Sequence, residues 1–154
     1  MIRPAVLFVC LGNICRSPLA EAAFRAEAAK AGLDAVADSA GTANYHVGEP
    51  PDPRAVRTAA KFGCNIARYR GRQVSAADFA RFTHIFALDH ANLKDLQQIA
   101  PAGHPAHVGL LLDLVPGRTG QAVADPWYGD EPGFLVTWDE VSAAARTLAS
   151  ELAQ

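Results

Sequence analysis

Cysteine, strong net charge and long hydrophobic runs are all scarce in this chain of 154 residues. Three cysteines are too few for the disulfide framework of a small secreted domain, and a net charge of −2 gives no basic surface for nucleic acid. No apolar run approaches the length that spans a membrane, and no signal-peptide pattern precedes the first expected strand. We therefore expect a cytoplasmic protein with neither a nucleic-acid nor a membrane partner.

The composition is that of a compact domain with a sizeable core, since half of the residues are hydrophobic and 19% are charged. The chain contains no internal repeat, linker or low-complexity tract. We expect one domain over residues 1–154.

Short apolar segments alternate with helical patterns along the chain. Strands are expected over residues 5–9, 35–39, 83–88 and 108–112. Helices are expected over residues 19–31, 53–62, 92–99 and 132–152, with a short one over Phe79 and Phe82 after a capping-box sequence from Ser75. This alternation predicts the α/β class, with a four-stranded parallel sheet covered by helices on both faces. Ligands bind beyond the carboxyl ends of the strands in such sheets.

Residues 10–17 read Cys-Leu-Gly-Asn-Ile-Cys-Arg-Ser and lie between the first expected strand and the first expected helix. We expect Ser17 to cap that helix and Pro18 to stand in its first turn. A glycine-bearing loop before a helix N-terminus gathers backbone N–H groups and partial positive charge, so it binds phosphate and favours a thiolate at Cys10. Arg16 adds a planar fork for two phosphate oxygens. We call residues 10–16 the phosphate loop.

A cysteine and an arginine at the same spacing occur again at Cys64 and Arg70. This second match follows an expected helix end and precedes no helix start, so we interpret it as a chance match. The first match could also be an ordinary turn with a buried cysteine. That alternative is weaker because a plain turn has no need of Gly12, Asn13 and Arg16.

Thiolate attack on a phosphate ester needs an acid that protonates the leaving oxygen. Asp125 stands in the loop after the last expected strand, where Pro126, Trp127 and Tyr128 follow it. The two aromatic residues have no strand or helix periodicity and could line a pocket for a planar ring. Alternatively, Asp125 starts a turn and Trp127 fills the core, and the pattern alone does not separate these interpretations.

The segment from Val9 to Pro18, with the late Asp-Pro-Trp-Tyr sequence, resembles the low-molecular-weight protein tyrosine phosphatase family. The similarity continues through residues 38–42, 50–52, 72–73, 87–89 and 92–93. It implies a phosphate loop after the first strand of a four-stranded parallel sheet. It also implies a cysteine-dependent hydrolase of phosphotyrosine proteins or small aryl phosphates, with a phosphocysteine intermediate, an oxyanion in the loop, and no cofactor or metal.

The resemblance implies a role for each residue of the catalytic group. Cys10 would be the nucleophile, and Arg16 would hold the phosphate and the transition state. Asp125 would be the general acid and then the base for the attacking water. Ser17 would donate a hydrogen bond to the Cys10 sulfur, which makes the sulfur a better leaving group in the second step.

The resemblance also implies loop support and a binding surface. Asn13 would hold the loop through contacts that include Ser39. Cys15 resembles the family's second loop cysteine, which can form a disulfide with Cys10 on oxidation; alternatively, it is a small buried filler. The implied phosphate-binding and pocket-lining residues are Leu11, Gly12, Asn13, Ile14, Cys15, Ser17, Tyr45, Trp127 and Tyr128.

One position departs from the family pattern, because a site before Arg72 that is often histidine carries Tyr69. The phenol either replaces the histidine contact or leaves Asn13 held by fewer bonds. His104 and His107 could suggest a metal, but Gly103 and Pro105 place them in a loop with no third ligand nearby in the sequence. His46, His84 and His90 have no evident role.

The same residues argue against other functions on related or different scaffolds. An arsenate reductase needs a downstream cysteine pair, whereas only Cys64 lies beyond the loop. A protein-arginine phosphatase of similar sequence has threonine in the place of Ile14, whose apolar side chain favours an aryl phosphate. A phosphocarrier would need neither Arg16 nor Asp125, and an inactive phosphate-binding module is disfavoured because Cys10, Arg16 and Asp125 are all present.

Overall fold

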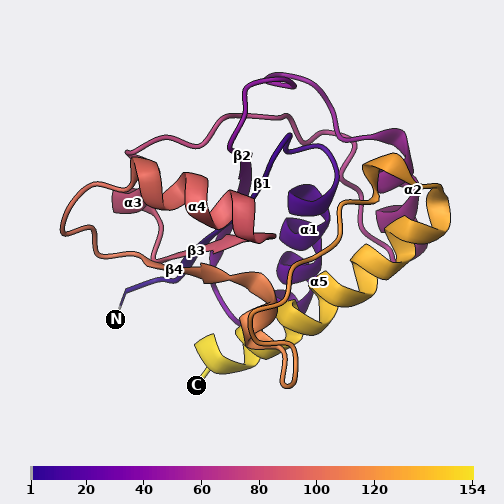
Figure 1. Cartoon of the computed structure of the whole chain (residues 1–154). Coiled ribbons are helices and arrows are strands. Elements are labelled where there is room, and N and C mark those ends of the chain that lie inside the picture. The colour runs from indigo at the N-terminus through magenta and orange to yellow at the C-terminus, as the bar shows by residue number, and fades with distance from the viewer. Residues whose placement is uncertain (1) are drawn as a thin grey trace.

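A parallel sheet of four strands forms the centre of the computed structural model, which describes residues 2–154 (Figure 1). The strands are β1 (Ala5–Cys10), β2 (Val36–Gly41), β3 (His84–Ala87) and β4 (His107–Leu110). Their order is β2-β1-β3-β4, so β1 is hydrogen-bonded on both sides. The expected α/β fold with a four-stranded parallel sheet is confirmed.

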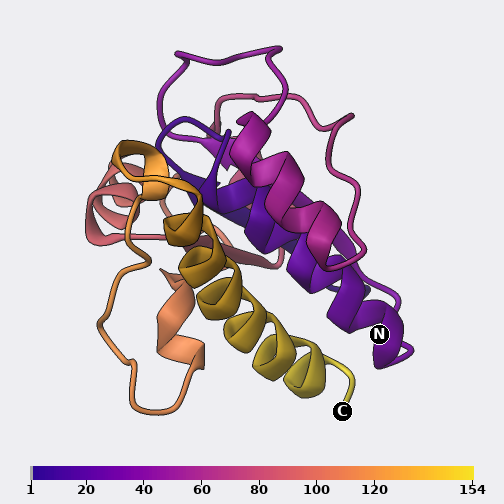
Figure 2. The same ribbon diagram turned by 90° about the vertical axis from the view of Figure 1, so that its right-hand side faces the viewer.

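Helices cover both faces of the sheet. On one face lie α1 (Arg16–Lys30) and α5 (Glu131–Leu152), and α2 (Pro53–Lys61) packs beside them (Figure 2). The short α3 (Asp78–Arg81) and α4 (His90–Ile99) lie on the other face (Figure 1). Two 3-10 turns, η1 (Leu111–Leu114) and η2 (Pro126–Tyr128), interrupt the long segment before α5. Within residues 2–154 there is no helix both long and apolar enough to cross a membrane.

Alternation along β1 divides the core into two layers. Phe8 faces α1 and α5, and its ring centroid lies 5.8 Å from that of Phe24 and 6.4 Å from that of Phe86. Leu7 and Val9 point to the opposite layer, which α3 and α4 cover. Burial on both faces explains why the β1 sequence is continuously apolar rather than alternating.

Three expectations about element boundaries are wrong. Ser17 does not cap α1: the helix begins at Arg16, Cys15 is its N-cap residue, and no side chain caps it. The last strand ends at Leu110 rather than 112, because the next four residues curl into η1. The segment after the last strand that carries Asp125, expected to be loop, contains η2 directly after this residue.

The end of β2 determines where the phosphate loop lies. Cys10, the last residue of β1, pairs with Gly41, and beyond it the Ala43 N–H donates to the Leu11 carbonyl at 3.0 Å. A Cβ atom placed on Gly41 would lie 2.6 Å from that carbonyl oxygen and 3.3 Å from the Asn13 Cβ. Glycine is needed here because the loop backbone passes directly over it.

We expect Gly41→Ala to lower the free energy of unfolding by about 1–3 kcal/mol, because the added methyl group displaces the loop backbone. Urea denaturation would measure the change. Gly109→Ala in β4 is the matched control, since its nearest neighbour would be the His107 Nε2 at an ordinary 3.5 Å. Equal losses in the two variants would contradict the explanation.

Candidate active site

A cavity of about 200 Å³ opens at the carboxyl end of the sheet. Three segments that are distant in sequence form its wall: the phosphate loop, residues 45–46 and residues 125–128. The lining residues are Cys10, Leu11, Gly12, Ile14, Cys15, Arg16, Tyr45, His46, Asp125, Trp127 and Tyr128. The predicted support residues Asn13, Ser17 and Ser39 are buried behind the loop rather than in the wall.

Cys10 has its sulfur between two polar groups of the loop. The Ser17 Oγ lies 3.0 Å from the Cys10 Sγ, and the Asn13 backbone N–H donates to the same sulfur at 3.3 Å. Ser17 can do this because it stands in the first turn of α1, with its side chain directed back toward the strand end. The hydroxyl that was expected to cap the helix therefore contacts the sulfur.

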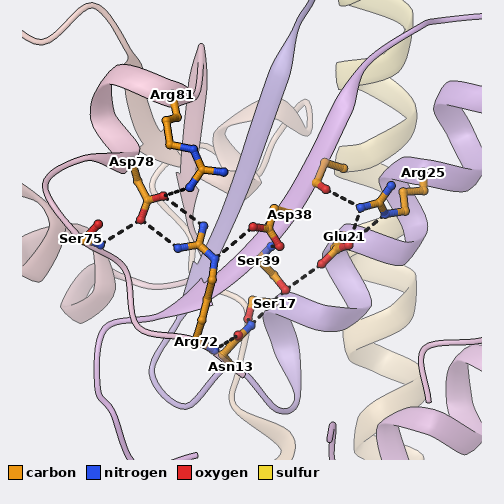
Figure 3. A network of polar contacts seen from close by, with 11 residues as sticks. Asn13, Ser17, Glu21, Arg25, Asp38, Ser39, Arg72, Ser75, Asp78 and Arg81 are labelled. Carbon is orange, nitrogen blue, oxygen red and sulfur yellow. Dashed lines mark hydrogen bonds and ion pairs between the residues drawn. The ribbon is translucent and has the colours of Figure 1, made fainter. Parts of the chain in front are cut away.

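The backbone of the phosphate loop changes direction at Asn13. Its φ of 61° is left-handed, a conformation that asparagine tolerates better than most residues. Its side-chain N–H groups donate to Ser17 Oγ at 2.8 Å and Ser39 Oγ at 3.0 Å, and its Oδ1 accepts from the Arg72 backbone N–H at 3.0 Å (Figure 3). Asn13 thus joins the loop to α1, to β2 and to the segment before α3.

The support network continues away from the cavity. Ser39 Oγ donates to the buried Glu21 carboxylate at 2.8 Å, and Glu21 in turn pairs with Arg25 at 2.9 Å (Figure 3). Tyr69 lies beside Glu21 and Arg25, and burial raises the pKa of its phenol to about 12. Within residues 2–154, no hydrogen bond joins Tyr69 to Asn13. The phenol therefore does not replace a direct contact of Asn13 with a histidine at this position.

Arg16 is a buried cation among acidic groups. Its Nη1 donates to Asp89 Oδ2 at 2.7 Å and to the Val123 carbonyl at 3.1 Å, and its Nη2 lies 3.7 Å from Asp125 Oδ2. Burial opposes the charge, but Cys10, Asp89 and Asp125 together raise the pKa of Arg16. The guanidinium therefore stays charged at the floor of the cavity.

Asp89 was not among the predicted site residues. It follows the carboxyl end of β3, and its second oxygen accepts the Asn92 N–H at 2.7 Å to cap α4. Its position after a buried strand was the available signal, because parallel strand ends share one edge of the sheet.

Asp125 both starts a turn and faces the cavity, so for this one residue the two interpretations are compatible. Its Oδ1 accepts the Trp127 N–H at 3.0 Å, while its Oδ2 is directed toward Arg16. The alternative that Trp127 fills the core is wrong, because 43% of that residue is exposed at the cavity mouth. Tyr128 is 91% exposed. We call residues 125–129 the acid segment.

His46 is a second residue that sequence reasoning missed. Its ring lies over Gly12 and 6.3 Å from the Trp127 ring, and Nδ1 pairs with Glu49. A lone histidine in a loop carries no pattern of its own, and only its neighbour Tyr45 pointed to this wall.

The other two cysteines differ from Cys10. Cys15 is buried, and burial together with the nearby Asp52 raises the pKa of its thiol. Cys64 lies outside the cavity, and no helix begins after Arg70 until α3, so the second motif lacks the helix start that follows the phosphate loop. Among residues 2–154, no group of three His, Cys, Asp or Glu side chains is placed to hold a metal ion.

We expect Asn13→Ala to destabilise the protein by about 1–3 kcal/mol, because buried partners lose their hydrogen bonds. Asn13→Gly loses the same bonds but accepts the left-handed backbone, so it should be about 1 kcal/mol more stable than the alanine variant. Thermal and urea unfolding of both proteins would measure these values. Identical free energies of unfolding would show that the left-handed backbone at this position does not destabilise alanine relative to glycine.

The family description "Low molecular weight phosphotyrosine protein phosphatase" matches residues 5–154. A protein of that name from Schizosaccharomyces pombe is 46% identical over 132 residues, which cover 84% of each chain. The solved structure of a protein tyrosine phosphatase from Entamoeba histolytica, with Hepes in its active site, superimposes with a TM-score of 0.91 at 34% identity, covering 97% of this chain and 96% of that one.

The fold is also similar to that of a Drosophila arginine phosphatase, with a TM-score of 0.89 at 30% identity, covering 95% of this chain and 96% of that one. Each of these proteins matches nearly the whole of the described sheet and its helices. The match over residues 5–154 takes in the phosphate loop and the acid segment alike. The chain belongs to the low molecular weight phosphotyrosine protein phosphatase family.

Proposed function

We propose that this phosphatase hydrolyses phosphotyrosine in proteins, and small aryl phosphates, through a phosphocysteine formed on Cys10. The supporting observation is that Cys10, Arg16 and Asp125 meet at one cavity although they come from both ends of the chain. A nucleophile, a cation and an acid at one phosphate-sized site are the groups that this reaction requires.

In the first step the substrate phosphate occupies the phosphate loop. Backbone N–H groups and Arg16 bind its three terminal oxygens and stabilise the charge that they carry in the transition state. The Cys10 thiolate attacks phosphorus in line with the leaving oxygen. As the S–P bond forms and the P–O bond breaks, Asp125 transfers its proton to the leaving phenolate.

In the second step water releases the phosphate. Asp125, now a carboxylate, takes a proton from the water as its oxygen attacks phosphorus, and the S–P bond breaks. The Ser17 hydroxyl, 3.0 Å from the sulfur, stabilises the departing thiolate. The products are inorganic phosphate and the regenerated Cys10 thiolate.

The cavity wall supports an aryl substrate. Leu11, Ile14, Tyr45 and Trp127 offer apolar surface around the mouth, and a phenyl ring can pack there while its phosphate reaches the loop. The likeness to an arginine phosphatase makes phosphoarginine the second candidate substrate. Ile14 argues against it, because an apolar side chain offers a guanidine no hydrogen bond.

We place the enzyme in a reducing compartment, the cytoplasm. All three cysteines are free within the described residues, and a reducing environment keeps Cys10 available for attack. Oxidation to a Cys10–Cys15 disulfide stays a prediction, to be tested by peptide mapping after peroxide treatment.

Cys10→Ser should abolish turnover while leaving the fold intact, because a serine hydroxyl stays protonated near neutral pH and does not attack. Steady-state assays with an aryl phosphate, beside circular dichroism and inorganic phosphate binding, would check this. Turnover retained in the purified variant would exclude Cys10 as the nucleophile.

Asp125→Asn should reduce kcat/KM most for substrates with poor leaving groups, since a phenolate of low basicity departs without a proton. A series of aryl phosphates with phenols of different acidity would give the dependence. A loss of the same size across the series would mean that Asp125 is not the acid.

Ile14→Thr should shift the ratio of kcat/KM values from phosphotyrosine toward phosphoarginine, because the hydroxyl can bond the guanidine. Parallel assays of wild type and variant on both phosphoamino acids would measure it. A wild-type enzyme that already prefers phosphoarginine would overturn the substrate assignment.

A further inference from the structure

The first turn of α2 lies between the phosphate loop and the acid segment. Asp52, the N-cap residue of this helix, donates its backbone N–H to the Ile14 carbonyl at 2.9 Å. Its carboxylate accepts the Arg54 backbone N–H at 2.8 Å. The start of α2 is thereby fixed to the phosphate loop.

The side chain of Arg54 reaches from this turn to the acid segment. Its Nε and Nη2 donate to the two oxygens of Asp52, each at 3.0 Å. Its Nη1 donates to the Gly129 carbonyl at 2.8 Å, and its Nη2 also donates to the Trp127 carbonyl at 3.2 Å. One guanidinium thus bonds a carboxylate on the phosphate-loop side and two carbonyls of the acid segment.

Two aromatic rings enclose the same guanidinium. Its central carbon lies 5.5 Å from the Trp127 ring centroid and 4.7 Å from that of Phe134, in the first turn of α5. Cation–π attraction favours this position, and the carboxylate of Asp52 keeps the side chain oriented. Arg54 therefore contacts both the backbone and the aromatic side chain that follow Asp125.

The acid segment has few other bonds to the rest of the protein. Apart from the turn bonds inside η2, its remaining hydrogen bonds among residues 2–154 are also local: the Trp127 N–H to the Asp125 carboxylate and the Gly129 N–H to the Pro126 carbonyl. The Asp125–Arg16 pair at 3.7 Å is its one further polar contact in the described chain, and that pair involves the phosphate-binding cation itself. Arg54 therefore supplies the polar contacts from outside the segment that do not involve the phosphate-binding cation.

We propose that Arg54 is a positioning residue for the general acid: it ties the acid segment to the phosphate loop and so holds the Asp125 carboxyl at the leaving oxygen. This inference rests on the proposed role of Asp125 as the acid. Arginine is required because its planar fork bonds the carboxylate and the two carbonyls at once, which the single ammonium group of lysine does not.

The first experiment compares Arg54→Gln, Arg54→Lys and the control Arg57→Gln. Arg57 also lies on α2 and pairs with Glu131 at the start of α5, but it makes no hydrogen bond to the acid segment. For both Arg54 variants we expect kcat/KM to fall about tenfold with phosphotyrosine peptide and less than about twofold with dinitrophenyl phosphate, because a misplaced acid matters only for a basic leaving group. Arg57→Gln should stay near wild type with both substrates.

A double-mutant cycle with Asp125→Asn supplies the sharper measurement. If Arg54 acts through Asp125, Arg54→Gln should cost less than about twofold in phosphotyrosine kcat/KM once Asp125 is already Asn, because the two losses are then not additive. Additive losses, a loss of equal size with both substrates, or the same loss in Arg57→Gln would each overturn the inference. If Asp125→Asn itself shows no leaving-group dependence, the proposed function fails instead.

Two further measurements separate positioning from unfolding. Acrylamide quenching of tryptophan fluorescence should rise in both Arg54 variants, since Trp127 loses the guanidinium that packs on its ring and bonds its carbonyl, while the chain's other tryptophan, Trp138, stays buried. Competitive inhibition by inorganic phosphate should change less than about twofold, because the loop N–H groups and Arg16 remain. Unchanged quenching would contradict a displaced acid segment. If Arg54→Gln does not fold, Arg54→Lys decides the question through the same assays.

Discussion

The hydrogen bonds of the Asn13 side chain are the constraint on which the active site depends. A loop that points its N–H groups inward leaves its own backbone without the partners that a helix or strand would supply. Asn13 resolves this with one left-handed residue whose amide bonds α1, β2 and the Arg72 backbone together. Because Asn13 donates to Ser17, the Ser17 hydroxyl hydrogen is free to point at the Cys10 sulfur.

The polar network behind the loop holds two buried carboxylates, Glu21 and Asp78, beside partly exposed arginines. The Arg72 guanidinium binds both oxygens of the fully buried Asp78 at 3.1 Å and one oxygen of Asp38 at 3.0 Å (Figure 3). Burial raises the pKa of Glu21 in spite of its bonds to Ser39 and Arg25. Such groups stabilise the fold only as complete sets, because the loss of one partner leaves the other charged and unsatisfied.

Short-range patterns predicted much of this protein, and long-range contacts account for what they missed. The phosphate loop was predictable because strand, glycine, asparagine and helix start lie within a few adjacent residues. The local pattern at Ser17 predicted a helix cap, because a hydroxyl at a helix start usually caps it; the contact of Ser17 with the Cys10 sulfur was implied only by the family resemblance. Asp89 reaches Arg16, and His46 reaches the cavity, only through the order of the strands and the path of a loop, which local periodicity does not encode. The predicted end of β4 was wrong for a related reason. Leu111 and Leu112 are buried and apolar, which fits a 3-10 turn as well as a strand.

The small buried side chains of α1 determine how closely this helix packs. Ala20, Ala22, Ala23 and Ala28 are buried, so the helix axis can lie close to the sheet. The first turn of this helix forms one wall of the anion site, and the helix is continuous from Arg16 to Lys30. A larger side chain at Ala28, four residues after Phe24 on the face that packs on Phe8 and about 18 Å along the axis from Arg16, would push the helix away from the sheet and redirect the N–H groups at its start. The packing of alanine methyl groups far from any substrate therefore sets the alignment of the catalytic apparatus.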